Sequence, residues 1–280
     1  SRAAERRRGA PRPLRDDMTF LAALRARAAA APRRIVFAES GDARVREAAE
    51  RLAAEGILHP VLALDPGAPE SHDAVFATGL EVVDPRRHPH RDEIARRLLA
   101  RRAGSGLTPA GAEALATDPL CLATGLVALG ALDGVVAGAV RTTGDVVRTA
   151  LWLIGMAPGV HTVSSAFYLV VPPFRDAASE VLTFTDCAVI PYPTAPQLAD
   201  IALAAATARA AVVGDVPRVA FLSFSTNGSA GGASVESVRE AVALVRERAP
   251  ALAVIGEVQA DAALIPDVAA RKVPGAAVAG

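Results

Sequence analysis

Two hydroxyl side chains and an arginine lie at the junction of a predicted strand and a predicted helix, in residues 139–148 (AVRTTGDVVR). The free backbone N–H groups and the dipole at the start of a helix favour an anion there. Thr142 and Thr143 add hydroxyl donors. Arg148 lies one turn further on, where its guanidinium can hold a phosphate through two bonds. The alternative is an ordinary helix cap formed by Thr143, with Arg148 on the surface.

A second junction lies in residues 222–232 (LSFSTNGSAGG), after one predicted strand and before a helix. Its hydroxyl groups can donate to a ligand, and its glycines let the backbone approach one closely. The glycine spacing differs from that of the dinucleotide-binding fingerprint. A flexible linker is the alternative, although this loop is longer than an ordinary connection between a strand and a helix.

Two carboxylates also follow predicted strands. Asp186 comes directly after the strand predicted at 181–185, and Glu257 lies where another strand runs into a helix (GEVQAD, 256–261). Ligands of open α/β sheets bind at the carboxyl ends of the strands, so each carboxylate is placed to act either as a base or as a cap. The spacing alone does not decide between these roles.

The sequence does not support several common chemistries. Lys272 is the only lysine, and the Gly-Lys-Ser/Thr of a phosphate-binding P-loop is absent. The Gly-x-Ser-x-Gly turn of serine hydrolases is absent too. His88 and His90 flank Pro89 in a polar stretch, which favours a solvated loop over a metal site. Because the formal net charge is zero, neither a nucleic acid nor an acidic membrane surface is the expected partner.

The elements that must position these residues alternate along the chain. A chain of 280 residues, 51% of them hydrophobic, is long enough for a large core. The alternation predicts an α/β fold with right-handed crossovers and a mostly parallel sheet. Strands are predicted at 35–38, 61–64, 81–83, 134–140, 181–185, 218–223 and 252–255, and helices at 19–30, 42–55, 91–102, 108–117, 121–129, 145–155, 195–213, 235–249 and 260–270.

Residues 149–174 contain no Asp, Glu, Lys or Arg, and this stretch is long enough to span a membrane. Pro158-Gly159 interrupts it, however, and Ser164 and Ser165 lie inside it. We therefore predict two buried elements joined by a turn, and no membrane segment.

Six blocks of sequence, taken in order, resemble the phosphate acetyl/butyryltransferase family from about Met18 to the end of the chain. The block 222–229 (LSFSTNGS) favours the acetyl-specific branch of that family over the butyryl branch. The six blocks are 35–44 (IVFAESGDAR), 132–148 (LDGVVAGAVRTTGDVVR), 162–172 (TVSSAFYLVVP), 184–193, 219–229 (VAFLSFSTNGS) and 256–280.

The resemblance implies two α/β domains with mostly parallel sheets flanking a cleft, as in isocitrate and isopropylmalate dehydrogenases. The expected division is a tail or linker at 1–17, a first domain at 18–157 and a second at 158–280. The resemblance also implies a cytoplasmic homodimer. The only two cysteines, Cys121 and Cys187, fit a reducing compartment.

The activity implied is reversible transfer of an acetyl group between acetyl-CoA and inorganic phosphate, giving acetyl phosphate and CoA. No bound cofactor is expected, because CoA is itself the substrate. The resemblance also implies that catalysis needs no metal. The resemblance assigns substrate binding to Arg102, Thr142, Thr143, Arg148, Ser164, Ser165, Asp186, Ser225, Thr226, Gly228 and Ser229.

Three residues depart from the family pattern: Arg141 replaces a common His, Ile255 a common Asp, and Ala276 a common Ser. Family members also continue beyond the block that ends at Gly280, and the base Asp and the oxyanion-binding Ser are expected in that further segment. The chain by itself is therefore expected to be weakly active or inactive. Two alternatives are a phosphate butyryltransferase, or another short-chain acyl specificity, and a non-catalytic acetyl-CoA-sensing domain of a fusion enzyme.

Overall fold

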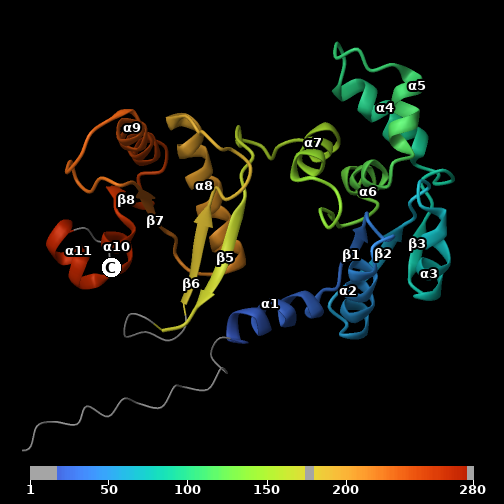
Figure 1. Cartoon of the computed structure of the whole chain (residues 1–280), viewed down its shortest axis with the longest axis horizontal. Helices are drawn as coiled ribbons and strands as arrows, with labels where there is room; N and C mark the ends of the chain where they lie inside the picture. The colour runs from blue at the N-terminus through green and yellow to red at the C-terminus, as the bar shows by residue number, and fades with distance from the viewer. Residues whose placement is uncertain (1–17, 174–179, 276–280) are drawn as a thin grey trace, which may run out of the picture. The chain divides into compact units, whose positions relative to one another are not determined.

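The computed structural model describes residues 18–173 and 180–275 (Figure 1). The chain divides into two compact units, residues 25–158 and residues 159–275, the latter taken with residues 18–24. The division therefore falls within helix α1 (Met18–Ala30). Segment 1–17, predicted as a tail or linker, and Ala276 lie outside the described residues.

A four-stranded sheet lies at the centre of residues 25–158, and all its neighbouring strands are parallel. The order is β3-β2-β1-β4, so β1 lies between β2 and β4, and the carboxyl ends of all four strands meet at one edge. The strands are short and apolar, as expected for a sheet covered on both faces. They are β1 (Arg34–Phe37), β2 (His59–Ala63), β3 (Glu81–Val83) and β4 (Gly134–Val136).

Alternation of side chains along these strands produces two cores, one on each face of the sheet. Val36 and Val61 belong to a core shared with α4 to α7, whereas Phe37 and Leu62 belong to one shared with α2 and α3. Helix α6 is buried from Pro119 through Leu126, which confirms the prediction of a buried helix there. The helices are α2 (Ala43–Ala54), α3 (His72–Ala77), α4 (Arg91–Arg101), α5 (Pro109–Ala116), α6 (Pro119–Ala128) and α7 (Thr143–Leu153), with a 3-10 turn, η1, at Pro69–Ser71.

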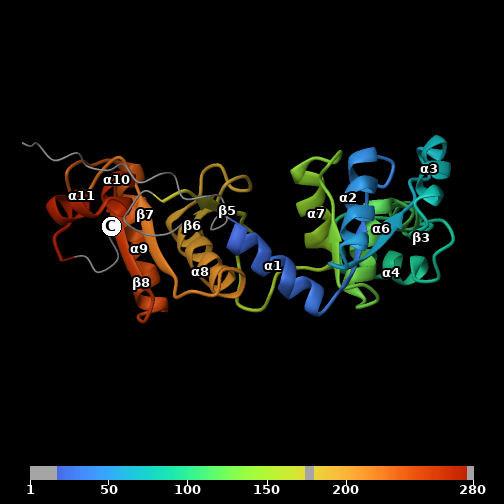
Figure 2. The same cartoon turned by 90° about the horizontal axis from the view of Figure 1, so that it is seen from below.

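Two strand pairs and two long helices form the framework of residues 159–275 (Figure 2). Strands β5 and β6 are antiparallel, whereas β7 and β8 are parallel. Helices α8 and α9 pack on β7 and β8 around a core that includes Ala199, Phe221, Val242 and Val254. The elements are β5 (Ala166–Val171), β6 (Glu180–Thr185), α8 (Ala195–Val212), β7 (Arg218–Leu222), α9 (Ala233–Arg248), β8 (Ala253–Val258), α10 (Ala260–Leu264) and α11 (Pro266–Lys272).

Helices α10 and α11 are joined by hydrogen bonds from the single lysine. Lys272 Nζ donates to Gln259 Oε1 and to Asp261 Oδ2, each at 2.8 Å. The sequence pattern predicted one helix over 260–270, and the structure corrects this to two. The first helix ends at Leu264 because Pro266 begins a new helix and disfavours helical backbone at the preceding residue.

Two further predictions need correction. The strand predicted at 134–140 ends at Val136, because residues 138–141 turn their backbone N–H groups to a carboxylate described below. The second element predicted in 149–174 is strand β5, and it is not buried, since Phe167 is 57% exposed and Leu169 is 43% exposed. Phe174 lies outside the described residues. None of the described helices combines the length and hydrophobicity needed to cross a membrane.

Candidate functional site

The loop between β4 and α7 is held by the carboxylate of Glu39, which is buried at the carboxyl end of β1. Its two oxygens accept the backbone N–H groups of four consecutive residues, 138 to 141, at 2.8, 2.7, 2.9 and 2.5 Å. Burial by itself raises the pKa of Glu39. The four N–H donors together lower the pKa by more than burial raises it, so the net shift is downward. Because β1 and β4 are adjacent parallel strands, this contact fixes the start of the loop that leads into α7.

Thr142 caps helix α7. Its Oγ1 accepts the backbone N–H of Asp145 at 3.2 Å and donates to Asp145 Oδ2 at 2.7 Å. The alternative interpretation of the sequence named Thr143 as the cap, but the capping residue is Thr142. Thr143 is the exposed first residue of the helix. The pKa of Asp145 is lowered, first by the Thr142 hydroxyl and also by the charge of Arg148. The Asp145 carboxylate thus accepts a hydrogen bond from the capping hydroxyl at the start of this helix, where the helix dipole favours a negative charge.

The two arginines singled out in the sequence, Arg102 and Arg148, meet at the ring of Trp152. The guanidinium carbon of Arg102 lies 4.0 Å from the ring centroid, and that of Arg148 lies 5.7 Å from it. Arg148 also pairs with Asp145, and Nε of Arg102 donates to Ser105 Oγ at 3.2 Å. The structure therefore gathers two cationic groups around the only tryptophan of the chain.

Arginines of α4 fix α4 to the end of α7. Arg97 Nε donates to the carbonyl oxygen of Leu153 at 2.7 Å, and Arg101 Nη2 donates to that of Ile154 at 3.2 Å. The last carbonyl groups of a helix lack partners within the helix and favour cations, so these bonds are the expected ones. They bring Arg102, which follows α4, next to the face of α7 that carries Arg148 and Trp152.

The sequence interpretation missed Trp152. One signal was available, because Trp152 follows Arg148 by four residues and side chains at this spacing are neighbours on a helix. The interpretation included Glu39 only as part of the family-like block 35–44, without its role as an acceptor for residues 138–141. The pairing of Arg141 with Asp118, 2.5 Å between Nη2 and Oδ2, was not predicted either.

In residues 159–275, Ser165 and Asp186 come together at the start of β5 and the end of β6. The Ser165 backbone N–H lies 2.8 Å from Asp186 Oδ1, and the Ser165 hydroxyl also bonds this oxygen. Asp186 Oδ2 accepts the N–H of Ile190 at 2.6 Å. Burial raises the pKa of Asp186, but the bonds from Ser165 and the loop lower it, to about 2. Of the two roles considered for Asp186, this arrangement favours a capping residue over a catalytic base. Ser164 is half-buried beside it.

The loop that contains Ser225 to Ser229 is organised around Glu257. Ser225 is fully buried, and its hydroxyl donates to Glu257 Oε1 at 2.9 Å. Gly228 N–H donates to the same oxygen at 2.8 Å, and Arg239 donates to both carboxylate oxygens at 2.9 Å. These bonds, chiefly those from Arg239, lower the pKa of Glu257 to about 2. Glu257 is therefore an anchor for the loop and, like Asp186, a poor general base at neutral pH.

The other hydroxyls of this loop also bond within the chain. Thr226 Oγ1 accepts the N–H of Gln259, and Ser229 Oγ accepts the N–H of Thr226, each at 2.9 Å. The sequence predicted that such hydroxyls donate to a ligand. In this conformation, the exposed residues that face solvent are Asn227, Gly228 and Ser229, while Ser225 and Thr226 are buried. These hydrogen bonds favour an ordered loop over the flexible linker considered as the alternative.

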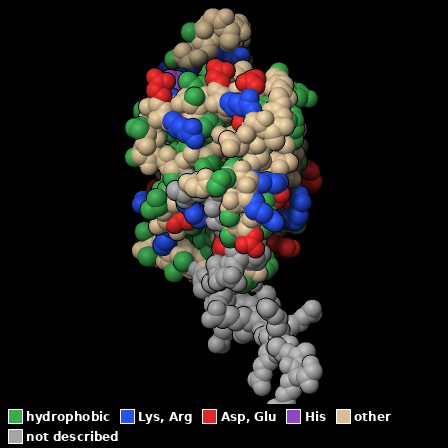
Figure 3. Space-filling view, turned by 90° about the vertical axis from the view of Figure 1, so that its left-hand side faces the viewer, with side chains coloured by type: hydrophobic (Ala, Val, Ile, Leu, Met, Phe, Trp, Pro, Cys, Tyr) green, Lys and Arg blue, Asp and Glu red, His purple; other side chains and the backbone are tan. Residues whose placement is uncertain are grey.

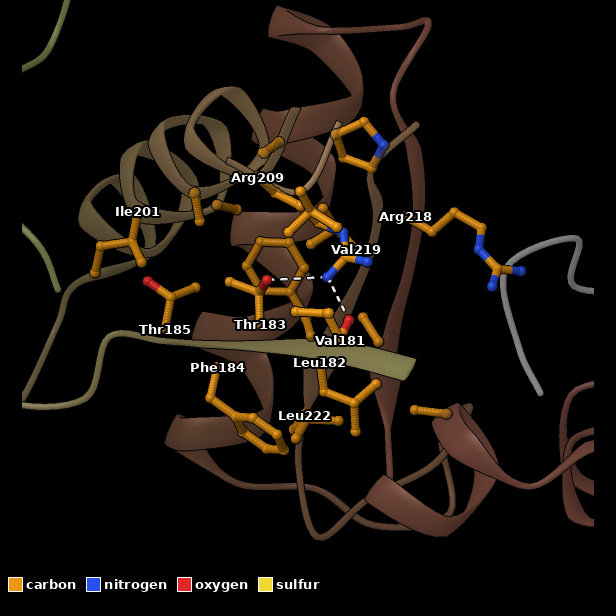
Figure 4. Close-up of a pocket in the computed structure, with 18 of the residues that line it drawn as sticks. Val181, Leu182, Thr183, Phe184, Thr185, Ile201, Arg209, Arg218, Val219 and Leu222 are labelled. Carbon is orange, nitrogen blue, oxygen red and sulfur yellow. Dashed lines mark hydrogen bonds between the residues drawn. The ribbon is translucent and has the colours of Figure 1, made fainter. Parts of the chain in front are cut away.

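A cavity of about 750 Å³ lies between β6, α8 and β7 (Figure 4). Its lining is largely apolar, and Arg209 crosses it from α8, with Nη1 donating to the Val181 carbonyl at 2.8 Å and to Thr183 Oγ1 at 3.0 Å. None of the residues assigned to substrate binding from the sequence is among its lining residues. On the face of this unit seen in Figure 3, acidic and basic side chains are interspersed.

Among the described residues, no group of three or more His, Cys, Asp or Glu is arranged to hold a metal ion. His88 and His90, the pair noted in the sequence, stack with ring centroids 5.6 Å apart. His90 Nδ1 lies 3.2 Å from Glu93 Oε2.

Comparison with known proteins shows to which family the chain belongs. The family model for Phosphate acetyl/butaryl transferase matches residues 19–280. A phosphotransacetylase structure from Streptococcus pyogenes superposes with a TM-score of 0.82 at 34% identity, covering 93% of this chain and 78% of that one. The chain therefore belongs to the phosphate acetyl/butyryl transferase family, as its resemblance predicted.

Two similar proteins are phosphate acetyltransferases. A phosphate acetyltransferase of Deinococcus radiodurans is 42% identical over 258 residues, which cover 91% of this chain. One from Clostridium acetobutylicum is 38% identical over 251 residues, which cover 89% of this chain and 75% of the relative. The chain spans only 36% of the length of the Deinococcus protein.

Proposed function

We propose that this chain, or a longer protein that contains it, is a phosphate acetyltransferase, which transfers an acetyl group reversibly between acetyl-CoA and inorganic phosphate. The observation that carries the proposal is the meeting of Arg102 and Arg148 at Trp152, in a chain that the family model matches from residue 19 to residue 280. The relatives named above, which carry this activity in their names, support it.

In the proposed reaction, the guanidinium groups of Arg102 and Arg148 bind the oxygens of phosphate or of acetyl phosphate. Planar guanidinium groups suit this role because they offer paired N–H donors and keep their charge at all physiological pH values. A phosphate oxygen attacks the thioester carbonyl, a C–O bond forms, and the tetrahedral intermediate collapses with cleavage of the C–S bond. The CoA thiolate leaves, and in the reverse direction it attacks the carbonyl of acetyl phosphate.

In the proposed reaction, the residues of this chain mainly bind substrate, and they contribute less to proton transfer. Asp186 and Glu257 each accept several hydrogen bonds and have a pKa of about 2, so neither is matched to act as a base near neutral pH. The proposal keeps the other assigned residues in the substrate site or among the residues that support its loops. They are Thr142, Thr143, Ser164, Ser165, Ser225, Thr226, Gly228 and Ser229. For the half-buried Ser165–Asp186 pair and the buried Ser225–Glu257 pair, we propose support of the loops that face the substrate.

The finer architecture is part of the same proposal. We infer two α/β domains, residues 18–157 and 158–280, that flank a substrate cleft as in isocitrate and isopropylmalate dehydrogenases, and a homodimeric assembly. CoA acts as a substrate and not as a bound cofactor. The family match and the superposition on a phosphotransacetylase support this arrangement.

The test is a measurement of the reaction rate, made on the purified chain or, where the chain is part of a longer protein, on that protein. Acetyl-CoA consumption is followed with and without phosphate, and butyryl-CoA is compared at the same concentration. We expect phosphate-dependent release of CoA with acetyl-CoA preferred, because block 222–229 favours the acetyl branch. Faster turnover of butyryl-CoA would replace acetyl by butyryl in the proposal. Binding of acetyl-CoA with no turnover would favour the non-catalytic sensing domain.

A further inference from the structure

We propose that Trp152 is a positioning residue, which holds Arg102 and Arg148 ready for one phosphate group by stacking against both guanidinium groups. The proposal rests on the proposed function, because it assumes that these arginines bind phosphate. Trp152 is the only tryptophan of the chain, and it lies one helical turn after Arg148 on α7.

The ring contacts explain how two like charges are held close together. The Arg102 guanidinium carbon lies 4.0 Å from the ring centroid, a distance at which a flat cation rests on the ring. The Arg148 carbon, at 5.7 Å, lies near the outer limit of the same interaction. The negative face of the aromatic ring offsets part of the repulsion between the two guanidinium groups, which an aliphatic side chain cannot do.

The remaining contacts of the two arginines leave donors for a ligand. Arg102 uses Nε to bond Ser105, and among the described residues its two terminal nitrogens make no hydrogen bond. Arg148 pairs with Asp145, but 54% of the Arg148 side chain and 34% of the Asp145 side chain are exposed. Such a solvated pair is weak, so a phosphate dianion can take the place of Asp145 at small cost.

Trp152 also packs against the core that surrounds α6, so a purely structural role must be separated from a positioning role. Trp152→Phe keeps an aromatic face and most of the packing. Trp152→Leu and Trp152→Met keep an apolar side chain but lose the face. A positioning role therefore predicts that the phenylalanine variant retains phosphate binding and that both aliphatic variants weaken it.

The first experiment is calorimetric titration of the wild type and the three variants with inorganic phosphate, after circular dichroism has shown which of them fold. We expect Trp152→Leu and Trp152→Met to raise the Kd for phosphate by about fivefold, the range of one or two cation–π contacts, and Trp152→Phe by less than about twofold. If either folded aliphatic variant binds phosphate as tightly as the wild type does, the role of Trp152 is overturned.

The second experiment uses the wild type alone and is independent of the folding of any variant. Because no other tryptophan emits, a phosphate titration with excitation at the tryptophan band reports Trp152 directly. We expect its emission to change with the same Kd that calorimetry gives, while chloride at equal ionic strength has no effect. Calorimetric binding without an emission change contradicts the proposal for Trp152 only. A wild type that binds neither phosphate nor acetyl phosphate overturns the proposed function as well.

Discussion

At the scale of single residues, buried and half-buried carboxylates position the loops of this protein. Glu39 binds four backbone N–H groups, Asp186 binds Ser165 and the loop after β6, and Glu257 binds Ser225, Gly228 and Arg239. Each carboxylate is near the end of a strand, where the backbone leaves the sheet and its N–H groups lose their strand partners. An ionised carboxylate satisfies several such groups at once, and so it keeps an irregular loop in one conformation.

Replacing Glu39 by glutamine should loosen the loop before α7. The amide presents an NH₂ group where the carboxylate accepted two N–H donors, so buried donors lose their acceptor. We expect Glu39→Gln to lower the free energy of unfolding by about 1–3 kcal/mol, measured in urea. Exchange of the amide hydrogens of residues 138–141 should become faster.

The exposed Glu47 on α2 provides the matched control, since Glu47→Gln removes the same charge without touching the loop. The anchoring role of Glu39 is contradicted if the two variants have the same urea midpoint and the same exchange rates.

The lowered pKa of Glu257 predicts an acid-sensitive contribution to stability. Its pKa falls from 4.5 to about 2 on folding, so the folded state favours the ionised form. The contribution is fully present above the unfolded pKa of 4.5 and is lost as the pH falls through about 2. We expect the urea midpoint of the wild type to decrease across this window.

Glu257→Gln should have a lower urea midpoint at pH 7 and a smaller decrease between about pH 4.5 and pH 2. The exposed Glu240 on α9 serves as the control position, because Glu240→Gln should leave the wild-type profile unchanged. Equal pH dependence in the wild type and Glu257→Gln would show that this carboxylate does not contribute.

At the scale of elements, the sequence predicted most of the parallel β-α pattern but missed one hairpin. The inner strands β1 and β2 have apolar runs that are buried on both faces, and these runs mark them clearly. Strand β5 was not identified as a strand because residues 149–174 lack charges throughout, so nothing separated a helix from a strand there. Its antiparallel pairing with β6 depends on contacts along the whole strand, which no local pattern records.

The candidate site was only partly predictable. Thr142 and Arg148 lie at a junction that a local pattern reveals, whereas Arg102 was assigned only through the family resemblance; the structure brings Arg102 and Arg148 together. That Ser225 is buried against Glu257 could not be predicted, because the two residues are far apart in sequence and meet only through the parallel pairing of β7 with β8.

Packing between α4 and α6 depends on a glycine. A Cβ placed on Gly125 would lie 2.6 Å from two side-chain carbons of Ile94, and Ile94 is fully buried. We expect Gly125→Ala to lower the free energy of unfolding by about 1–3 kcal/mol, since overpacking outweighs the gain in helix propensity. Chemical denaturation of the purified variant measures this.

Gly144→Ala is the control for helix propensity alone, because the nearest atom to its added Cβ is 3.8 Å away. Its stability should remain within about 0.5 kcal/mol of the wild type. The double variant Ile94→Ala/Gly125→Ala should be more stable than the sum of its single effects, and simple additivity would rule out the clash as the cause.

At the scale of the whole molecule, each of the two units contains cores of its own. The clusters around α6 and around α2 lie within residues 25–158, and those of α8 to α11 lie within residues 159–275. A protein in which no described core cluster extends across the division is expected to lose stability locally when one core is damaged.

Leu122 and Val245, both fully buried, allow this to be tested by one substitution in each unit. Leu122→Ala should cost about 2–5 kcal/mol and speed amide exchange in residues 25–158, with residues 159–275 largely unaffected. Val245→Ala should give the reverse pattern. If either variant accelerates exchange equally in both units, as measured by mass spectrometry, the two units unfold together.

The single lysine gives the molecule an unusual chemical handle. Lys272 is 38% exposed on α11, and every other basic side chain apart from the histidines is an arginine. Reagents that acylate primary amines should therefore modify one side chain of the whole chain, besides the terminal amine. A dye or cross-linker attached in this way marks α11 in unit 159–275 without any substitution. Residues 25–158 carry no amine side chain, so the label gives distances that start from one known point.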